Sequence, residues 1–224
     1  MRLSVLLAGL ILLVACPSFA QSNVTLYVEG GPEISNEPKQ FDNFYSTGVH
    51  VGGGVGYPIT GDLEVLLRAQ YDALPFDETG VKDFLREGGF IGPEDRSDTE
   101  VKGAGANLLS GTVSLKLNST IGRRLGVSLI GGVGLYRHET YGVDVDFPSG
   151  STVQAFEFIE QEGTSVGFNV GFGFSLPVTE DVNARVEPQL ILVFSGEGEE
   201  TAPLLERTGD LSYIPIQFGV SWNL

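Results

Sequence analysis

Charged and amide side chains recur at alternate positions within stretches of sequence that are otherwise apolar. Seven of them are candidates for shared chemistry: Glu29, Glu64, Arg68, Lys116, Arg185, Glu187 and Gln189. Inside a protein, such groups can form a closed network of ion pairs and hydrogen bonds, or they can line a polar path for small solutes. Because an unpaired buried charge is strongly destabilising, we predict a structural network. A narrow solute channel is the alternative.

Two histidines, His50 and His138, are the other candidates for catalysis or metal binding. A metal site would need a carboxylate on the same face, and the neighbouring Glu139 has the opposite parity. The chain has one Cys, which excludes a CxxC zinc or redox site. We therefore predict no metal, no cofactor and no enzymatic activity. A lipid-modifying membrane enzyme is the alternative.

The elements that must position these residues are strands, because apolar residues alternate with small or polar ones in period two. The clearest run is 214–224, in which every second residue from Ile214 to Leu224 is apolar. Eight such runs occur, at residues 24–29, 49–59, 63–72, 109–117, 125–136, 166–178, 182–194 and 214–224. The second face of each run is mostly Gly, Ser, Asn, Gln or charged. We predict an all-β protein of eight strands.

The connections between these runs alternate between short and long. The short ones lie at 60–62, 118–124 and 179–181, and the long ones near 33–44, 73–103, 139–163 and 195–211. Short turns at one end and long loops at the other are typical of an eight-stranded antiparallel up-and-down transmembrane β-barrel. A weak repeat supports this register, since residues 57–63 and 176–182 each contain a Pro and a tight turn between two runs.

The apolar face must meet either lipid or a protein core. In a small barrel the interior is just wide enough for side chains, so small and polar residues fit inside and lipid covers the apolar exterior. Aromatic residues near the strand ends are expected to form interface girdles: Tyr45, Tyr57, Tyr71, Tyr136, Phe194 and Trp222. A soluble ligand-binding barrel, with its apolar face inward, is the alternative.

The first 20 residues resemble a secretory signal. Arg2 precedes an apolar run from Leu3 to Ala15, and residues 18–20 have the small-x-small pattern of a cleavage site. We predict a signal peptide at 1–20 and an outer-membrane barrel domain at 21–224. In the alternative, Cys16 is the lipidated first residue of a lipoprotein.

With this signal and its eight alternating runs, the chain resembles the small outer-membrane β-barrel superfamily of OmpA and OmpX type. The resemblance implies a monomer in the lipid of the bacterial outer membrane, inserted by the barrel-assembly machinery. Family members usually end in Phe or Trp, which that machinery reads. Here the corresponding signal is shifted onto Phe218, Trp222 and Leu224.

The net charge of the chain is −16, which excludes nucleic acid as a partner because phosphate binding needs a basic face. The four long connections hold 22 acidic and six basic residues. Such acidity serves solubility, or it binds divalent cations or a cationic extracellular partner. We therefore expect a structural or adhesion-like role through these segments.

Overall fold

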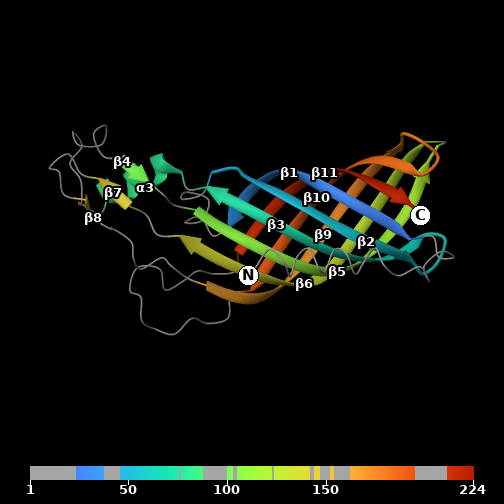
Figure 1. Cartoon of the computed structure of the whole chain (residues 1–224), viewed down its shortest axis with the longest axis horizontal. Helices are drawn as coiled ribbons and strands as arrows, with labels where there is room; N and C mark the ends of the chain where they lie inside the picture. The colour runs from blue at the N-terminus through green and yellow to red at the C-terminus, as the bar shows by residue number, and fades with distance from the viewer. Residues whose placement is uncertain are drawn as a thin grey trace, which may run out of the picture.

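The computed structural model describes residues 24–37, 46–75, 77–87, 100–102, 105–122, 124–141, 144–146, 152–153, 162–194 and 211–224. Eight strands close a barrel: β1 (Thr25–Glu37), β2 (Gly48–Pro58), β3 (Leu63–Pro75), β5 (Gly105–Ile121), β6 (Leu125–Tyr141), β9 (Glu162–Pro177), β10 (Val182–Phe194) and β11 (Leu211–Asn223). Each strand pairs antiparallel with its neighbours in the sequence, and β11 pairs with β1. The predicted eight-stranded up-and-down barrel is confirmed (Figure 1).

The two ends of the barrel differ. The end where the connections 59–62, 122–124 and 178–181 lie is called the short-turn end here, and the opposite end is the long-loop end. Beyond the long-loop end lie helix α3 (Glu78–Glu87) and a small sheet of β4 (Glu100–Lys102), β7 (Asp144–Asp146) and β8 (Thr152–Val153) (Figure 1). No helix in the described ranges is long and apolar enough to cross a membrane.

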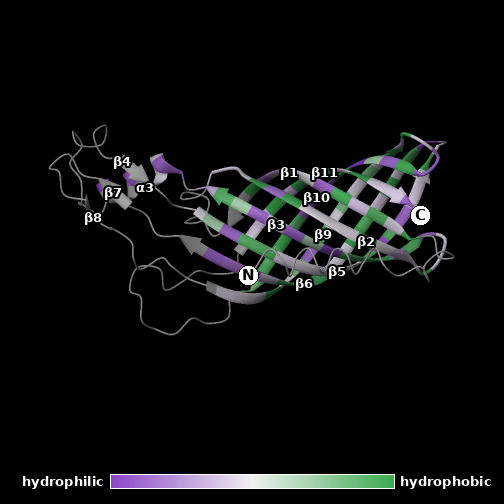
Figure 2. Ribbon diagram, viewed as in Figure 1, coloured by the Kyte–Doolittle hydropathy of each residue, from purple (hydrophilic) through white to green (hydrophobic). Residues whose placement is uncertain are grey.

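The outer face of the barrel carries the apolar residues. Along β9, Phe168, Val170 and Phe172 are each about half exposed, while the residues between them are buried. In Figure 2, apolar (green) positions alternate with white or purple ones along the strands of the barrel wall. This orientation is the reverse of the one that a soluble ligand-binding barrel requires, and it places the apolar face where lipid can cover it.

Two of the short turns have the same construction. The backbone N–H of Ile59 donates to the carbonyl of Leu63 at 2.7 Å, and that of Val178 donates to the carbonyl of Val182 at 2.8 Å. In each turn a threonine, Thr60 or Thr179, accepts a backbone hydrogen bond through its hydroxyl at 3.1 Å. The equivalence explains the repeat at 57–63 and 176–182.

Several strands extend further toward the long-loop end than the alternation predicts. Strand β1 continues to Glu37 and β3 to Pro75. Glu33, which the sequence pattern assigns to a loop, is therefore a fully buried residue of the barrel interior. The pattern misses this segment because Gly30, Gly31 and Pro32 interrupt the apolar alternation.

A glycine in this segment is needed for close packing of the wall. A Cβ added to Gly31 would lie 2.1 Å from the carbonyl oxygen of Ile216 on β11, a backbone atom that cannot move aside cheaply. The same Cβ would come within 3.3 Å of the His50 ring. Small residues on the inner face thus let β1 approach its neighbours.

The girdle prediction is partly wrong. Tyr57, Tyr71, Phe194 and Trp222 point outward and are exposed, but Tyr136 is fully buried inside the barrel, because position 136 shares the parity of the inward residues of β6. Tyr45, the predicted signal segment 1–20 and Cys16 lie outside the described residues.

Candidate functional site: the barrel interior

Five of the predicted polar residues meet in one ion-pair cluster: Glu29, Arg68, Lys116, Arg185 and Glu187. Arg68 is its centre, with Nε 2.8 Å from Glu29 Oε1 and Nη2 2.7 Å from Glu187 Oε1. Lys116 Nζ lies 3.2 Å from Glu187 Oε2. Arg185 Nη2 bridges the same two carboxylates, contacting Glu29 and lying 3.3 Å from Glu187 Oε1. Two carboxylates are thus shared among three cations from β3, β5 and β10.

Tyr27 and Glu64 extend this cluster toward the short-turn end. The Tyr27 hydroxyl donates to Glu64 Oε1 at 2.7 Å, and the Asn118 amide donates to Glu64 Oε2 at 3.3 Å. The Tyr27 ring lies between two cations, with Lys116 Nζ 4.7 Å and the Arg185 guanidinium 4.4 Å from its centroid. Both distances are within the range of cation–π attraction.

An amide layer follows on the other side of the ion-pair cluster, formed by Gln70, Asn169, Gln189 and Gln217. Gln189 Nε2 donates to Glu187 Oε1 at 2.8 Å and to Gln217 Oε1 at 3.3 Å. Gln217 in turn donates to Gln70 at 3.1 Å, and Asn169 donates to Gln189 at 3.0 Å. The layer links four strands across the lumen.

The sequence-predicted residues therefore come together. The structure places Glu29, Glu64, Arg68, Lys116, Arg185, Glu187 and Gln189 in the interior, all buried and all in the contacts described above. The prediction did not include Tyr27, which the period-two pattern places on the polar face of its strand. That position was the available signal, because a tyrosine on the polar face of its strand points into the barrel, where its hydroxyl and ring can contact charged side chains.

The long-loop end of the interior is closed by an apolar plug, which the sequence analysis did not predict. It is a contiguous cluster of buried side chains: Leu74, Ala106, Leu108, Tyr136, Ile191, Val193 and Tyr213. The inner face, expected to be mostly small or polar, is therefore apolar at this end. Adjacent apolar residues such as Leu108 and Leu109 point to opposite faces. Because both are apolar, the alternation does not show which of the two is buried.

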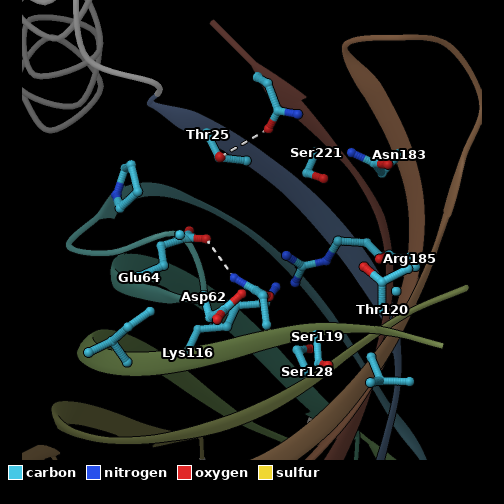
Figure 3. A pocket seen from close by; sticks show the side chains of 18 of the residues that line it. Thr25, Asp62, Glu64, Lys116, Ser119, Thr120, Ser128, Asn183, Arg185 and Ser221 are labelled. Carbon is cyan, nitrogen blue, oxygen red and sulfur yellow. Dashed lines mark hydrogen bonds between the residues drawn. The ribbon is translucent and has the colours of Figure 1, made fainter.

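The short-turn end is open instead. A cavity of about 730 Å³ begins there and is lined by hydroxyl and amide side chains, among them Thr25, Asn118 and Asn183 (Figure 3). Its inner end is formed by Glu64, Lys116 and Arg185, so it reaches the ion-pair cluster. The interior is thus a polar vestibule, a charged layer, an amide layer and an apolar plug in succession.

The two histidines take different places in this interior. His50 is buried on β2, and its register partner on β3 is Asp72, a carboxylate that the sequence analysis did not consider for it. His138 is half-buried on β6, against Gly163 of β9. Within the described ranges, no group of three His, Cys, Asp or Glu side chains is placed to hold a metal ion.

The proposed assembly-signal residues lie on the outer face of the last strand. Phe218, Trp222 and Leu224 are 54%, 37% and 71% exposed. Strand β11 closes the barrel by pairing with β1, with Trp222 opposite Leu26, and the backbone N–H of Leu224 donates to the carbonyl of Val24 at 2.9 Å. These three side chains are therefore presented outward.

The fold and this interior define a closed, filled barrel with an apolar exterior, and comparison with known proteins assigns its family. A family model described as the outer membrane protein beta-barrel domain matches residues 6–223. The chain belongs to this family. No curated protein gives a significant match.

Solved structures of outer-membrane barrels show the same fold. Neisserial surface protein A is 14% identical, with a TM-score of 0.56, over 90% of this chain and 97% of that one. A major outer membrane protein from Thermus thermophilus is 10% identical, with a TM-score of 0.52, over 90% and 99%. The N-terminal β-barrel domain of Pseudomonas aeruginosa OprF is 15% identical, with a TM-score of 0.46, over 91% and 98%. At these identities the likeness to the first two concerns the fold alone.

Proposed function

We propose that the chain is a monomeric integral protein of the bacterial outer membrane whose barrel is an anchor, with a structural or adhesion-like role carried by its acidic segments outside. One observation carries the proposal: the exterior is apolar, whereas the interior is filled by the ion-pair cluster, the amide layer and the apolar plug. A filled barrel offers lipid a surface but offers solutes no wide path. The role proposed is non-enzymatic.

The segments beyond the long-loop end are the chain's most charged part. Of the 29 acidic residues, 22 fall in the four connections counted from the sequence, and among those whose burial the structure describes, Glu33 lies buried in the barrel. Outside these connections, the seven remaining acidic residues are matched by seven basic ones, so the net negative charge of the sequence belongs to the connections. Divalent cations or a cationic partner are the chemistry that such a surface fits.

Conductance measurements test whether the barrel is an anchor and not a channel. We expect planar bilayers containing the full chain to show no discrete conductance. A narrow channel is the rival, favoured by the cavity that reaches Arg185 from the short-turn end. Steady single-channel currents would support that rival and overturn the anchor.

The test of the surface role uses cells that express the full chain and a variant with Glu197, Glu199 and Glu200 changed to Gln. We expect attachment of the cells to a cationic surface to fall in this variant, while heat-modifiable migration of the folded barrel stays unchanged. A control variant changes Glu180 to Gln, on a turn at the opposite end. Equal attachment of all three would contradict the proposal.

A further inference from the structure

The barrel interior holds more acids than its cations can neutralise. Among the buried charged side chains of the described residues, five are acidic and three are Arg or Lys: Glu29, Glu33, Glu64, Asp72 and Glu187, against Arg68, Lys116 and Arg185. The three cations lie with Glu29, Glu64 and Glu187 toward the short-turn end. The two remaining acids, Glu33 and Asp72, have no ion-pair partner among these buried cations.

Glu33 and Asp72 form a carboxyl pair beneath the apolar plug. Both residues are fully buried, and their carboxyl groups are within hydrogen-bonding reach of each other. They come from β1 and β3, on either side of β2. There Gly48, opposite Glu33, has no side chain to separate them. Burying two like charges this close is strongly unfavourable unless a proton or a cation lies between them.

Most oxygens of this pair receive no donor from the rest of the protein. Apart from the contact between the two carboxyl groups, Glu33 has no hydrogen-bond partner, and Asp72 has one, the Gln70 amide, which reaches only Oδ1. Buried polar groups in native proteins are almost always satisfied, so an unsatisfied group calls for a water or an ion. Here three such oxygens, two of Glu33 and one of Asp72, lie together in the barrel interior.

The aromatic hydroxyls next to the pair are unsatisfied too. Tyr136 and Tyr213 are fully buried, and the hydroxyls of both have no partner. Tyr213 lies within electrostatic reach of both carboxyl groups, and Tyr136 within reach of Asp72. His50, opposite Asp72 in the register, also has both ring nitrogens unpartnered. Two unpartnered phenol oxygens therefore lie near two carboxyl groups whose charge is −2 when both are ionised.

We propose that Glu33 and Asp72 bind a hard divalent cation, Mg²⁺ or Ca²⁺, inside the barrel, with phenol oxygens of Tyr136 and Tyr213 and water completing its shell. Two carboxylates with water are a usual ligand set for Mg²⁺, and Ca²⁺ accepts further neutral oxygens. The cation neutralises the pair and satisfies the orphan oxygens. This site is distinct from the acidic segments outside, because the apolar plug lies between them.

The experiment is refolding of the full chain in detergent micelles with Mg²⁺ or Ca²⁺, followed by a chelator wash of the folded protein and measurement of the retained metal by mass spectrometry. We expect one ion per barrel to survive the wash and to be released on unfolding. We expect the chelator to remove ions bound elsewhere on the chain, such as at the acidic connections. With Tb³⁺ in place of Ca²⁺, we expect luminescence sensitised by excitation of tyrosine.

Variants separate this site from any other. Glu33→Gln and Asp72→Asn should each lose the chelator-resistant ion, and Tyr213→Phe should lose it faster than the wild type. Glu64→Gln, another buried carboxylate, is the matched control and should keep it. Heat-modifiable migration checks that each variant is folded. A wild-type barrel that folds and retains no metal, or retention that is equal in all variants, overturns the proposal and leaves a shared proton between the carboxyls.

Discussion

The two halves of the barrel interior accommodate buried carboxyl groups in different ways. Toward the short-turn end, charges are neutralised by one another and the outermost of them border an open vestibule. Toward the long-loop end, an apolar plug excludes water, and the carboxyl pair beneath it has no protein cation. The difference teaches that charges beside the vestibule are neutralised by one another, whereas a carboxyl pair sealed from solvent needs a bound cation or a shared proton.

The largest expected effect comes from breaking the charged half. Replacing Arg68 with Met removes a cation shared by Glu29 and Glu187 while keeping a side chain of similar length. We expect a loss of about 3–5 kcal/mol in the free energy of unfolding, because two buried carboxylates lose their central partner. Urea unfolding in detergent micelles, followed by the fluorescence of the single Trp, measures it.

The control for this prediction is an exposed ion pair that also contains an arginine. Arg86 on α3 lies 3.5 Å from Asp83, and their side chains are 41% and 39% exposed. Arg86→Met should cost at most about 1 kcal/mol, as is usual for exposed pairs. If both substitutions cost the same, the interior cluster does not hold the barrel together.

The next effect in size comes from breaking the plug. Leu108→Ala removes a fully buried side chain of the plug, and we expect a cost of about 2–5 kcal/mol, which includes the cavity that is left. The neighbouring Leu109 is 54% exposed on the outer face and provides the comparison. Lipid or detergent can fill the space left by Leu109→Ala, so no cavity forms. The loss of stability then comes only from the smaller apolar surface that is buried, and it is smaller than for Leu108→Ala.

The same urea titration compares the two leucine variants in one micelle system. A Leu109→Ala protein that is less stable than Leu108→Ala would show that the plug is loosely packed and that the outer face supplies more of the stability.

The exterior and the strand number were predictable because they rest on local alternation. The eight runs, their outward faces and the inward positions of residues such as Arg68 and Glu187 all follow from period two, and the structure has them so. Lipid on one face and side chains on the other impose this period on every strand. No knowledge of the pairing between distant strands was required.

The long-loop half was not predictable in the same way. Glu33 follows two glycines and a proline, which interrupt the alternation, and only its pairing with β2 and β11 shows that β1 continues past them. Leu108 is adjacent to another leucine, so parity alone cannot say that it is the buried one. The contact between Glu33 and Asp72 depends on the register across β2, which no local pattern contains.

The smallest effect is expected at the border between the charged half and the vestibule. Tyr27→Phe removes the hydroxyl that donates to Glu64 at 2.7 Å but keeps the ring between Lys116 and Arg185. We expect a loss of about 0.5–1.5 kcal/mol, the usual net value of one hydrogen bond. Glu64 lines the cavity and keeps its bond from Asn118, so water can replace the lost donor.

A second substitution at the same position shows whether solvent access is the reason. Tyr27→Leu also removes the ring, and with it the cation–π contacts to Lys116 and Arg185, each worth up to about 2 kcal/mol when desolvated. The leucine variant should therefore be clearly less stable than the phenylalanine variant in the same urea titration. Equal stability would mean that the ring contributes nothing. A Tyr27→Phe loss as large as that of Arg68→Met would mean that water does not reach Glu64, and the contrast between the two halves would fail.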